Sequence, residues 1–88
     1  MFYVYLLLSL KDNKFYTGYT KSLKNRLNYH NKGLVESTKN RRPLKLIYYE
    51  SYLNKADALG RELFLKSGSG KRYIKKQLKN YLNQTYNA

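Results

Sequence analysis

Two short tyrosine motifs near the start of the chain contain the residues best suited to chemistry on a phosphate. They are Tyr3-Val4-Tyr5 and Tyr16-Thr17-Gly18, and ten residues after Tyr16 comes Arg26. A planar guanidinium suits a phosphate group, because its N–H donors match the spacing of the phosphate oxygens. If the motifs lie on two paired strands and Arg26 lies on the helix that follows, these side chains converge on one point.

Two more titratable residues extend this set. His30 is the single histidine of the chain, and an imidazole exchanges protons near neutral pH. Glu62 is one of only five acidic residues and sits between Leu59 and Leu63 on a predicted helix. A carboxylate beside a buried stripe is a candidate metal ligand, because Mg²⁺ often uses one or two protein carboxylates and completes its shell with water and substrate phosphate.

Each of these residues also has a purely structural explanation when it is taken singly. Tyr5 and Tyr16 could form a cross-strand aromatic pair, and Arg26 could be one of 18 basic residues on the surface. His30 could cap the end of its helix, and Glu62 could pair with a lysine one turn later. The order and spacing of the whole set favour a functional site over five separate coincidences.

The charge of the chain points to a polyanionic partner. Its 88 residues contain 18 Lys and Arg against 5 Asp and Glu, for a formal net charge of +13. Nucleic acid fits this balance, and its binding should weaken steeply with salt. A merely solubilising basic surface is the alternative. An anionic membrane is a weaker one, because no segment joins a basic face to an exposed aromatic and leucine face.

Length and composition predict one domain in the cytoplasm. A chain of 88 residues is the size of a single small domain. There are no cysteines, which excludes disulfides and thiolate metal sites and favours an intracellular protein. No apolar run approaches the length of a membrane span, and the N-terminus lacks the features of a signal peptide.

Hydrophobic patterning predicts a β-hairpin followed by a helix in the first half of the chain. The expected strands cover residues 2–10 and 15–19, with a turn at 11–14. The helix begins at residue 21 or 22, runs to about residue 31 and buries Leu23 and Leu27, and Gly33 ends it. A polar and basic loop then covers residues 34–42.

The second half predicts a strand and two helices. The strand covers residues 44–52, with Leu46, Tyr48 and Glu50 on one side and Ile47 and Tyr49 on the other. A helix capped by Asn54 buries Ala56, Leu59 and Leu63, and it ends at residues 67–70. A last helix over 71–83 buries a stripe of four apolar positions: Ile74, Leu78, Tyr81 and Leu82.

The predicted order is therefore β-β-α-β-α-α, a small α+β fold with a three-stranded antiparallel sheet flanked by helices. Residues 1–84 form the single domain, and residues 85–88 form a frayed tail. Small ribosomal proteins share such an order, so the order alone leaves the function open.

In its ordered motifs the chain resembles the GIY-YIG nuclease superfamily. It is similar to the small stand-alone bacterial branch that is grouped with the excision-repair incision nuclease and with structure-specific nucleases. The resemblance extends from residue 2 to about residue 78. It includes the two tyrosine motifs, Leu23 to Arg26, His30-Asn31, Arg42-Pro43, the strand 46–50, and Arg61-Glu62 leading to Leu65-Lys66-Ser67-Gly68.

The resemblance implies roles for five residues. Tyr5 and Tyr16 match the tyrosines of the two half-motifs, and Arg26 matches the arginine that stabilises the scissile phosphate. His30 falls at the position of a tyrosine or histidine proposed in base activation, and Glu62 matches the single metal-binding glutamate. The chain departs from the pattern at Tyr3, Thr17 and Tyr19, and at Ile74, near which several branches carry a late polar residue.

The sequence as a whole thus predicts a GIY-YIG-type endonuclease that hydrolyses DNA phosphodiester bonds with Mg²⁺ or Mn²⁺, in DNA repair or processing. Glu62 is the expected metal ligand, and Tyr5, Tyr16, Arg26, His30 and Glu62 are the expected catalytic residues. DNA is the expected partner, with a protein partner that could supply specificity and with no membrane. The alternatives are a non-catalytic basic module that binds nucleic acid and a ribosome- or RNA-associated protein.

Overall fold

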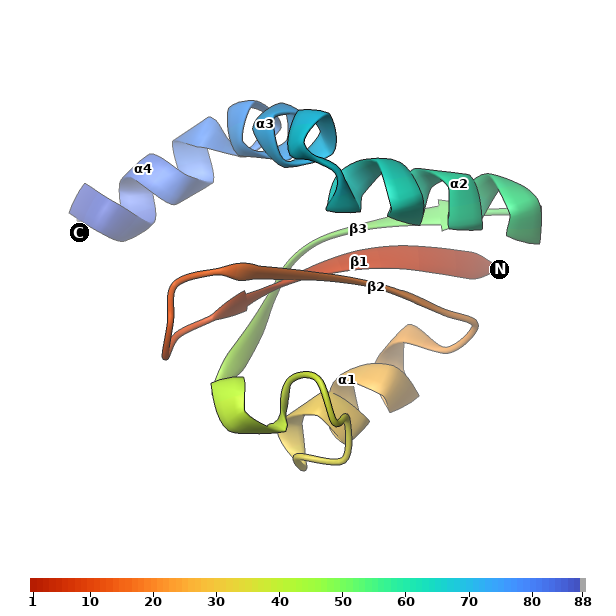
Figure 1. The fold of residues 1–88 in the computed structure, drawn as a ribbon, viewed down its shortest axis with the longest axis horizontal. Helices are drawn as coiled ribbons and strands as arrows, with labels where there is room; N and C mark the ends of the chain where they lie inside the picture. The colour runs from red at the N-terminus through yellow and green to blue at the C-terminus, as the bar shows by residue number, and fades with distance from the viewer. Residues whose placement is uncertain (88) are drawn as a thin grey trace.

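A three-stranded antiparallel sheet forms the centre of the molecule (Figure 1). The computed structural model describes residues 1–87, with side chains described as far as residue 84. The strands are β1 (Phe2–Ser9), β2 (Phe15–Thr20) and β3 (Leu44–Tyr52), in the order β2-β1-β3. The strand that comes first in the chain, β1, is therefore the central strand of the sheet, and β2 is an edge strand.

Helices cover both faces of this sheet. The helix α1 (Leu23–Asn31) and the short 3-10 helix η1 (Lys39–Arg41) lie on one side, and α2 (Lys55–Lys66) and α3 (Gly68–Gln77) lie on the other (Figure 1). A further helix, α4 (Lys79–Asn87), extends beyond the sheet. This is the expected α+β fold with a three-stranded antiparallel sheet. The predicted tail covers residues 85–88. The side chains of these residues lie outside the described part of the chain, and so does the backbone of Ala88.

Alternate residues of β1 supply two separate cores. Val4 and Leu6 pack with Ala58, Leu65 and Ile74 beneath α2 and α3. Tyr5 and Leu7 face α1 with Leu44, and Leu23 and Leu27 of α1 pack against them as predicted. The strand is apolar on both faces because it is covered on both faces.

The prediction for the faces of β3 was wrong at one point, and a β-bulge is the reason. Leu6 pairs with Tyr48, but Leu7 pairs with Leu46, so Ile47 is an extra residue in the register. One extra residue reverses the alternation of side chains along a strand. Leu46 therefore joins the core beneath α1, whereas Tyr48 joins the core beneath α2.

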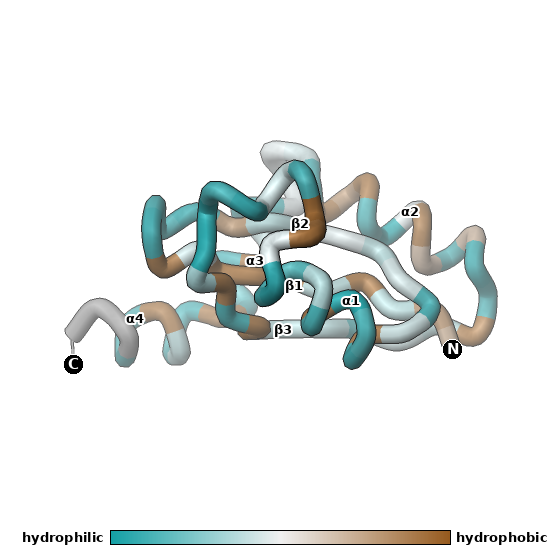
Figure 2. The backbone as a smooth tube through the Cα atoms, turned by 90° about the horizontal axis from the view of Figure 1, so that it is seen from below, coloured by the Kyte–Doolittle hydropathy of each residue, from teal (hydrophilic) through white to brown (hydrophobic). Residues whose placement is uncertain are grey.

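The predicted buried stripe of α2 was also wrong. Ala56, Leu59 and Leu63 are exposed, and Leu63 keeps 73% of its surface. The buried residues are Ala58 and Leu65, so the helix is rotated relative to the prediction. Hydrophobic residues occur along the whole of α2 (Figure 2), and apolar periodicity alone therefore gave two competing faces.

The last predicted helix is two helices. Ser67 accepts a hydrogen bond from the Gly70 backbone N–H and caps α3, so the segment expected to end α2 also begins the next helix. Gly70 is buried against Phe64 and Leu65, where a Cβ would overlap the backbone. The helix α3 ends at Gln77 with Leu78 as its C-cap, and Ile74, Leu78, Tyr81 and Leu82 are all buried or half-buried. No helix of the described chain is long and apolar enough to span a membrane.

Candidate active site

The hydroxyl of Tyr5 lies at the centre of the candidate site. Tyr5 pairs with Gly18 across the hairpin, and its side chain is 1% exposed. Its hydroxyl is hydrogen-bonded to Nε2 of His30 at 2.8 Å. The hairpin and the first helix therefore bring together two residues that are 25 positions apart in the chain.

His30 is held on both sides. Its Nδ1 is hydrogen-bonded to the Thr38 hydroxyl at 2.7 Å, and Thr38 is fully buried in the loop before η1. Burial, and then the positive charge of Arg26, lower the pKa of His30 to about 4. The imidazole is therefore neutral at pH 7, with one nitrogen able to accept a proton and the other to donate one.

Tyr16 completes a cluster of three aromatic rings. Its ring centroid is 5.2 Å from that of His30 and 6.3 Å from that of Tyr5. Tyr16 is half-buried, so part of the ring remains accessible. The expected convergence of the two tyrosine motifs is present in the structure, and His30 lies with them.

Arg26 lies against the same hydroxyl. It is four residues, about one helical turn, before His30 on α1. Burial raises the pKa of Tyr5 to about 12, although the adjacent guanidinium of Arg26 opposes this shift. The contact with Tyr5 in turn raises the pKa of Arg26. The Nε of Arg26 is buried and has no hydrogen-bond partner among the described residues. A buried donor without a partner is costly. Arg26 as a whole is half-buried, so part of its side chain remains accessible.

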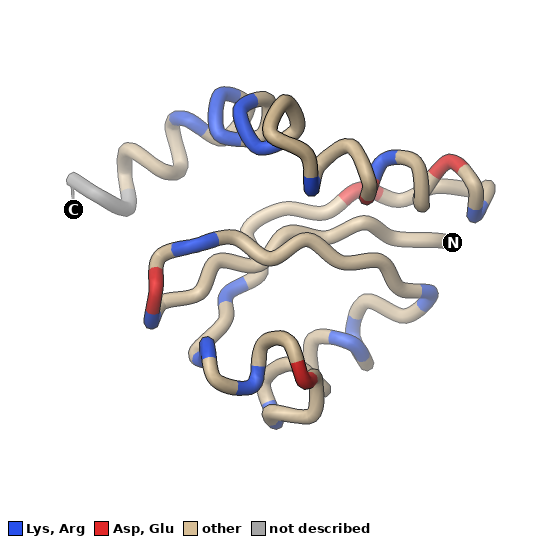
Figure 3. Tube along the Cα trace, in the orientation of Figure 1, with Lys and Arg blue, Asp and Glu red and all other residues tan. Residues whose placement is uncertain are grey.

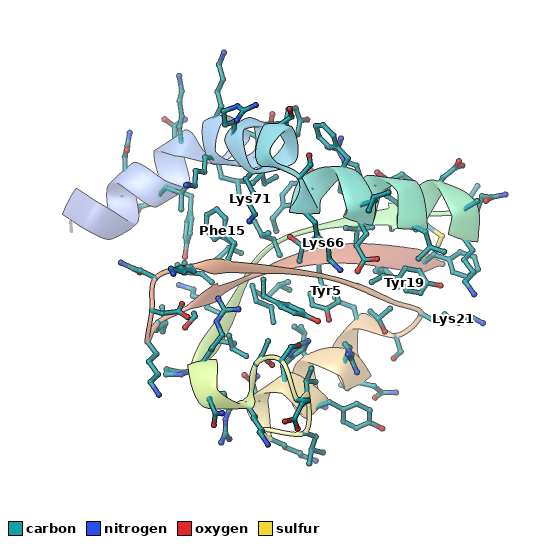
Figure 4. The ribbon with its side chains drawn as sticks, viewed as in Figure 1. Tyr5, Phe15, Tyr19, Lys21, Lys66 and Lys71 are labelled. Atoms are coloured by element: carbon teal, nitrogen blue, oxygen red, sulfur yellow. The ribbon has the colours of Figure 1, made fainter. Side chains whose placement is uncertain are left out.

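Glu62 approaches this cluster from the other helical layer. It lies between Ala58 and Leu65 on the buried side of α2, with its side chain 19% exposed. Its carboxylate is 3.3 Å from the Lys66 ammonium, which is the expected helical pair. Its negative charge contributes to raising the pKa of the Tyr5 hydroxyl, so the two groups share one electrostatic environment. In Figure 4, Tyr5 lies on one side of β2, and Lys66 and Tyr19 lie on the other.

The donor set suits one hard divalent cation whose shell is completed by substrate. The described residues contain no group of three or more His, Cys, Asp or Glu side chains that could hold a metal. Glu62 offers an accessible carboxylate, and Mg²⁺ can be held by a single carboxylate with water and phosphate oxygens. Lys66 would have to give up its contact with Glu62 in that state.

Glu50 on β3, a second carboxylate that contacts α2, already has its hydrogen-bonding capacity filled. It accepts hydrogen bonds from the hydroxyls of Tyr48 and Tyr52, and from Arg61 at 2.9 Å. Burial alone would raise its pKa, but these donors outweigh burial and leave the pKa below its usual value. Arg61 also lies over the rings of Phe64 and Tyr73. Glu50 therefore anchors α2 to β3 and has little capacity for a metal.

Sequence reasoning missed Thr38 and the state of Tyr19. Thr38 lies in a loop that shows no periodicity, so nothing in the sequence marks it as a partner of His30. The hydroxyl of Tyr19 is buried without a hydrogen-bond partner in the described structure. It occupies the position where some branches of the resembled superfamily carry a lysine, and that departure was the available signal.

Comparison with known proteins agrees with this arrangement. A family model described as the GIY-YIG catalytic domain matches residues 1–87. The chain belongs to the GIY-YIG family. This family is one of nucleases, so both the fold and the general class of the domain follow from membership.

Several bacterial relatives align with most of this GIY-YIG chain. The "UPF0213 protein" of Pediococcus pentosaceus is 44% identical over 85 residues, covering 96% of this chain and 88% of the relative. "UPF0213 protein SH2523" of Staphylococcus haemolyticus is 40% identical, covering 83% and 89%. "UPF0213 protein YazA" of Bacillus subtilis is 40% identical, covering 81% and 70%. No solved structure was found to match the chain.

The basic residues are spread over both helical layers. Lys and Arg lie along α3, on the β1–β2 hairpin, on α1 and around η1 (Figure 3). The acidic residues are few, and those described in ion pairs are Asp12, Glu36, Glu50 and Glu62. The surface near the candidate site is therefore strongly positive, which favours a phosphate backbone.

Proposed function

We propose that this GIY-YIG protein is a metal-dependent endonuclease that hydrolyses phosphodiester bonds of DNA. The observation that carries the proposal is the half-buried Arg26, whose guanidinium lies against the Tyr5 hydroxyl, beside the hydrogen-bonded pair of Tyr5 and His30. A donor for a phosphate and a route for a proton thus lie at one point, as in-line hydrolysis requires.

Tyr5 and His30 form the proposed proton route. In the tautomer that we assign, the Tyr5 hydroxyl donates to His30 Nε2, and Nδ1–H of His30 donates to Thr38. The Tyr5 oxygen then keeps its lone pairs for the attacking water. As the water oxygen bonds to phosphorus, its proton passes to the Tyr5 oxygen while the Tyr5 proton passes to His30. A bound phosphate would offset the charge of Arg26 and make His30 more basic.

Arg26 and Glu62 complete the proposed chemistry. Arg26 binds the phosphate through its guanidinium and offsets the charge that develops there. Glu62 would hold one Mg²⁺ or Mn²⁺, which when bound would polarise the phosphate and stabilise the leaving 3′ oxygen. Tyr16 borders the pair of Tyr5 and His30 and limits access of bulk water to it.

The net charge of +13 supports DNA as the substrate and predicts strongly salt-dependent binding. Repair or processing of DNA in the cytoplasm is the setting that we propose. A small domain of this kind would obtain specificity from the structure of the DNA or from a protein partner.

The deciding experiment is Glu62→Gln, with Glu36→Gln as the matched control. Glu36 pairs with Lys39 on the surface, where its side chain is 88% exposed, so both changes remove one carboxylate that pairs with a lysine. We expect Glu62→Gln to abolish Mg²⁺-dependent cleavage while DNA binding without metal stays equal or improves, because one negative charge is lost. Glu36→Gln should cleave as the wild type does.

Two results would contradict the proposal. Wild-type cleavage by Glu62→Gln would remove the metal assignment. A wild-type protein that binds DNA tightly but cleaves no DNA with either Mg²⁺ or Mn²⁺ would instead support the non-catalytic binding module.

A further inference from the structure

A basic cleft lies where β2 begins, next to α3 and α4. Its volume is about 680 Å³, and its lining includes Lys14, Phe15, Arg41, Lys71 and Lys75. The candidate active-site residues do not line it. Phe15 and Lys71 both point into the space between β2 and the helices above it (Figure 4).

The charge of this cleft is largely unpaired. Asp12 is the one acidic residue in its lining, and its carboxylate is held by Arg41 at 2.7 Å. None of the ion pairs of the described residues engages Lys14, Lys71 or Lys75. The three ammonium groups are therefore free to bind an anion, and the three lysines line the same cleft as the half-buried ring of Phe15.

The cleft continues along β2 toward the candidate active site. A smaller cleft of about 260 Å³ is lined by Tyr16, Thr17 and Lys66, and it shares Phe15 and Lys71 with the larger one. Lys66 is the residue that pairs with Glu62. The two clefts thus form one path along the edge strand, from the carboxylate of Glu62 to the lysines of α3.

The start of this path is held in a fixed shape. Arg41 donates hydrogen bonds to the backbone carbonyls of Lys14 and Phe15 as well as to Asp12. Asn13 adopts a left-handed conformation with φ of 61°, which asparagine tolerates better than most residues. The turn and the ring of Phe15 are therefore positioned before any ligand arrives.

We propose that this path binds an unpaired nucleic-acid strand that flanks the phosphate at the active site. The inference rests on the proposed function for the position of that phosphate. Lysines along a groove follow a backbone, and the part of the half-buried Phe15 ring that lines the cleft can stack on a base without regard to sequence. A cleft of this volume suits a ligand of one or two nucleotides, whereas a base pair with both backbones does not enter it.

The substrate that this geometry selects is a DNA junction between paired and unpaired strands, or a single strand. The paired part, where there is one, lies outside the path, and the unpaired part lies along β2. The cleft thereby supplies a structural preference that needs no second domain.

The test measures binding in the Glu62→Gln background, so that no substrate is consumed. The probes are a fluorescently labelled 12-nucleotide oligo(dT) and a blunt hairpin duplex with the same number of nucleotides. We expect tighter binding of the oligo(dT). Phe15→Leu keeps an apolar side chain in the core and should weaken oligo(dT) binding roughly tenfold through lost stacking, with little effect on the duplex.

A pair of double variants then separates the cleft from overall charge. Lys71→Gln with Lys75→Gln should weaken oligo(dT) binding roughly tenfold or more at low salt. Lys32→Gln with Lys55→Gln removes the same charge from exposed positions outside both clefts and should weaken it much less. Thermal unfolding of each variant shows whether the fold is retained.

Some outcomes overturn this inference alone. Equal losses in the two double variants, or tighter binding of the duplex than of oligo(dT), would show that the path is not a strand site. Competition by a poly-glutamate peptide as strong as by oligo(dT) would assign the cleft to acidic protein segments instead. If binding follows the expectation but the wild type cleaves neither probe nor a forked duplex, the proposed function fails and the strand site stands.

Discussion

The ring of Tyr5 lies directly on Gly18, its partner on the neighbouring strand. A Cβ added at Gly18 would overlap Cζ and the hydroxyl oxygen of Tyr5. The glycine of the second motif is therefore needed by the tyrosine of the first. The two motifs, 13 residues apart in the chain (5 to 18), act as one unit because of the antiparallel register.

Gly18→Ala should displace the Tyr5 hydroxyl from His30. We expect the free energy of unfolding to fall by about 1–3 kcal/mol, because the overlap lies in a packed site, and cleavage to fall more than DNA binding. Chemical denaturation and single-turnover cleavage measure the two effects. Gly60→Ala is the control, since a Cβ there meets nothing within 4 Å and alanine stabilises a helix by about 0.5–1 kcal/mol. Equal behaviour of the two variants would remove the steric explanation.

The buried imidazole of His30 predicts a stability that depends on pH. Its pKa is about 4 in the folded protein and about 6.5 in an unfolded chain. Between these values the unfolded state binds more protons, so stability is lost as the pH falls from 6.5 toward 4. The full difference is roughly 3 kcal/mol, at about 1.4 kcal/mol per pH unit.

In the upper part of this pH window, the change in stability comes from the histidine alone. The carboxylates whose pKa is lowered in the folded protein, such as Glu50, begin to titrate only at lower pH. Denaturant midpoints between pH 7 and 5 should fall steadily for the wild type. They should stay nearly constant for His30→Gln, whatever its stability at pH 7. A histidine pKa near 6.5 in the folded protein, measured by NMR, would contradict this account.

Arg26→Ala should separate binding from catalysis. Arg26 is one of 18 basic residues, so we expect DNA affinity to change little. Loss of its contact with the reacting phosphate should cost about 2–4 kcal/mol in the transition state. Lys24→Ala, an exposed residue on the same helix, provides the matched control. Comparable losses of affinity and cleavage rate in Arg26→Ala would mean that Arg26 only binds the backbone.

Glu50→Gln should be a stability variant and not a catalytic one. The change leaves the Arg61 charge without its carboxylate in a site where the side chains are 24% and 17% exposed. We expect a loss of about 1–3 kcal/mol in the free energy of unfolding, with the cleavage rate per folded molecule preserved. A selective loss of Mg²⁺-dependent cleavage with unchanged stability would reassign the metal ligand from Glu62 to Glu50.

The helices and strands of the first half of the chain were predictable, because the apolar residues of each follow one periodicity and turn-forming residues mark where each begins and ends. The strands around Tyr5 and Tyr16 are apolar and bounded by turn residues, and Gly33 ends the first helix with φ of 75°. The closeness of Arg26 and His30 follows from their four-residue spacing on that helix. The sequence could not reveal the hydrogen bond from His30 to Thr38, which depends on how an aperiodic loop folds back.

The errors in the second half have one physical cause each. An extra residue at Ile47 reversed the alternation of β3, and no local signal marks a bulge between residues that all favour strands. The helix α2 is apolar on two sides, and the buried one includes Glu62, a residue that sequence rules place outside. The packing of Ala58 and Leu65 into the core with Val4, Leu6 and Ile74 sets that orientation, and Glu62, between them, pairs with Lys66.

The place of β1 in the sheet has a consequence for synthesis on the ribosome. The chain makes its central strand before either neighbour, and β3 ends only at Tyr52. Until that residue has left the exit tunnel, one edge of the most apolar strand has no partner. The apolar side chains beneath α2 and α3 stay uncovered for longer, because their core is complete only after Ile74 has emerged. The nascent chain therefore exposes residues 4–8 for most of its translation, and general chaperones that bind short apolar segments would meet it there.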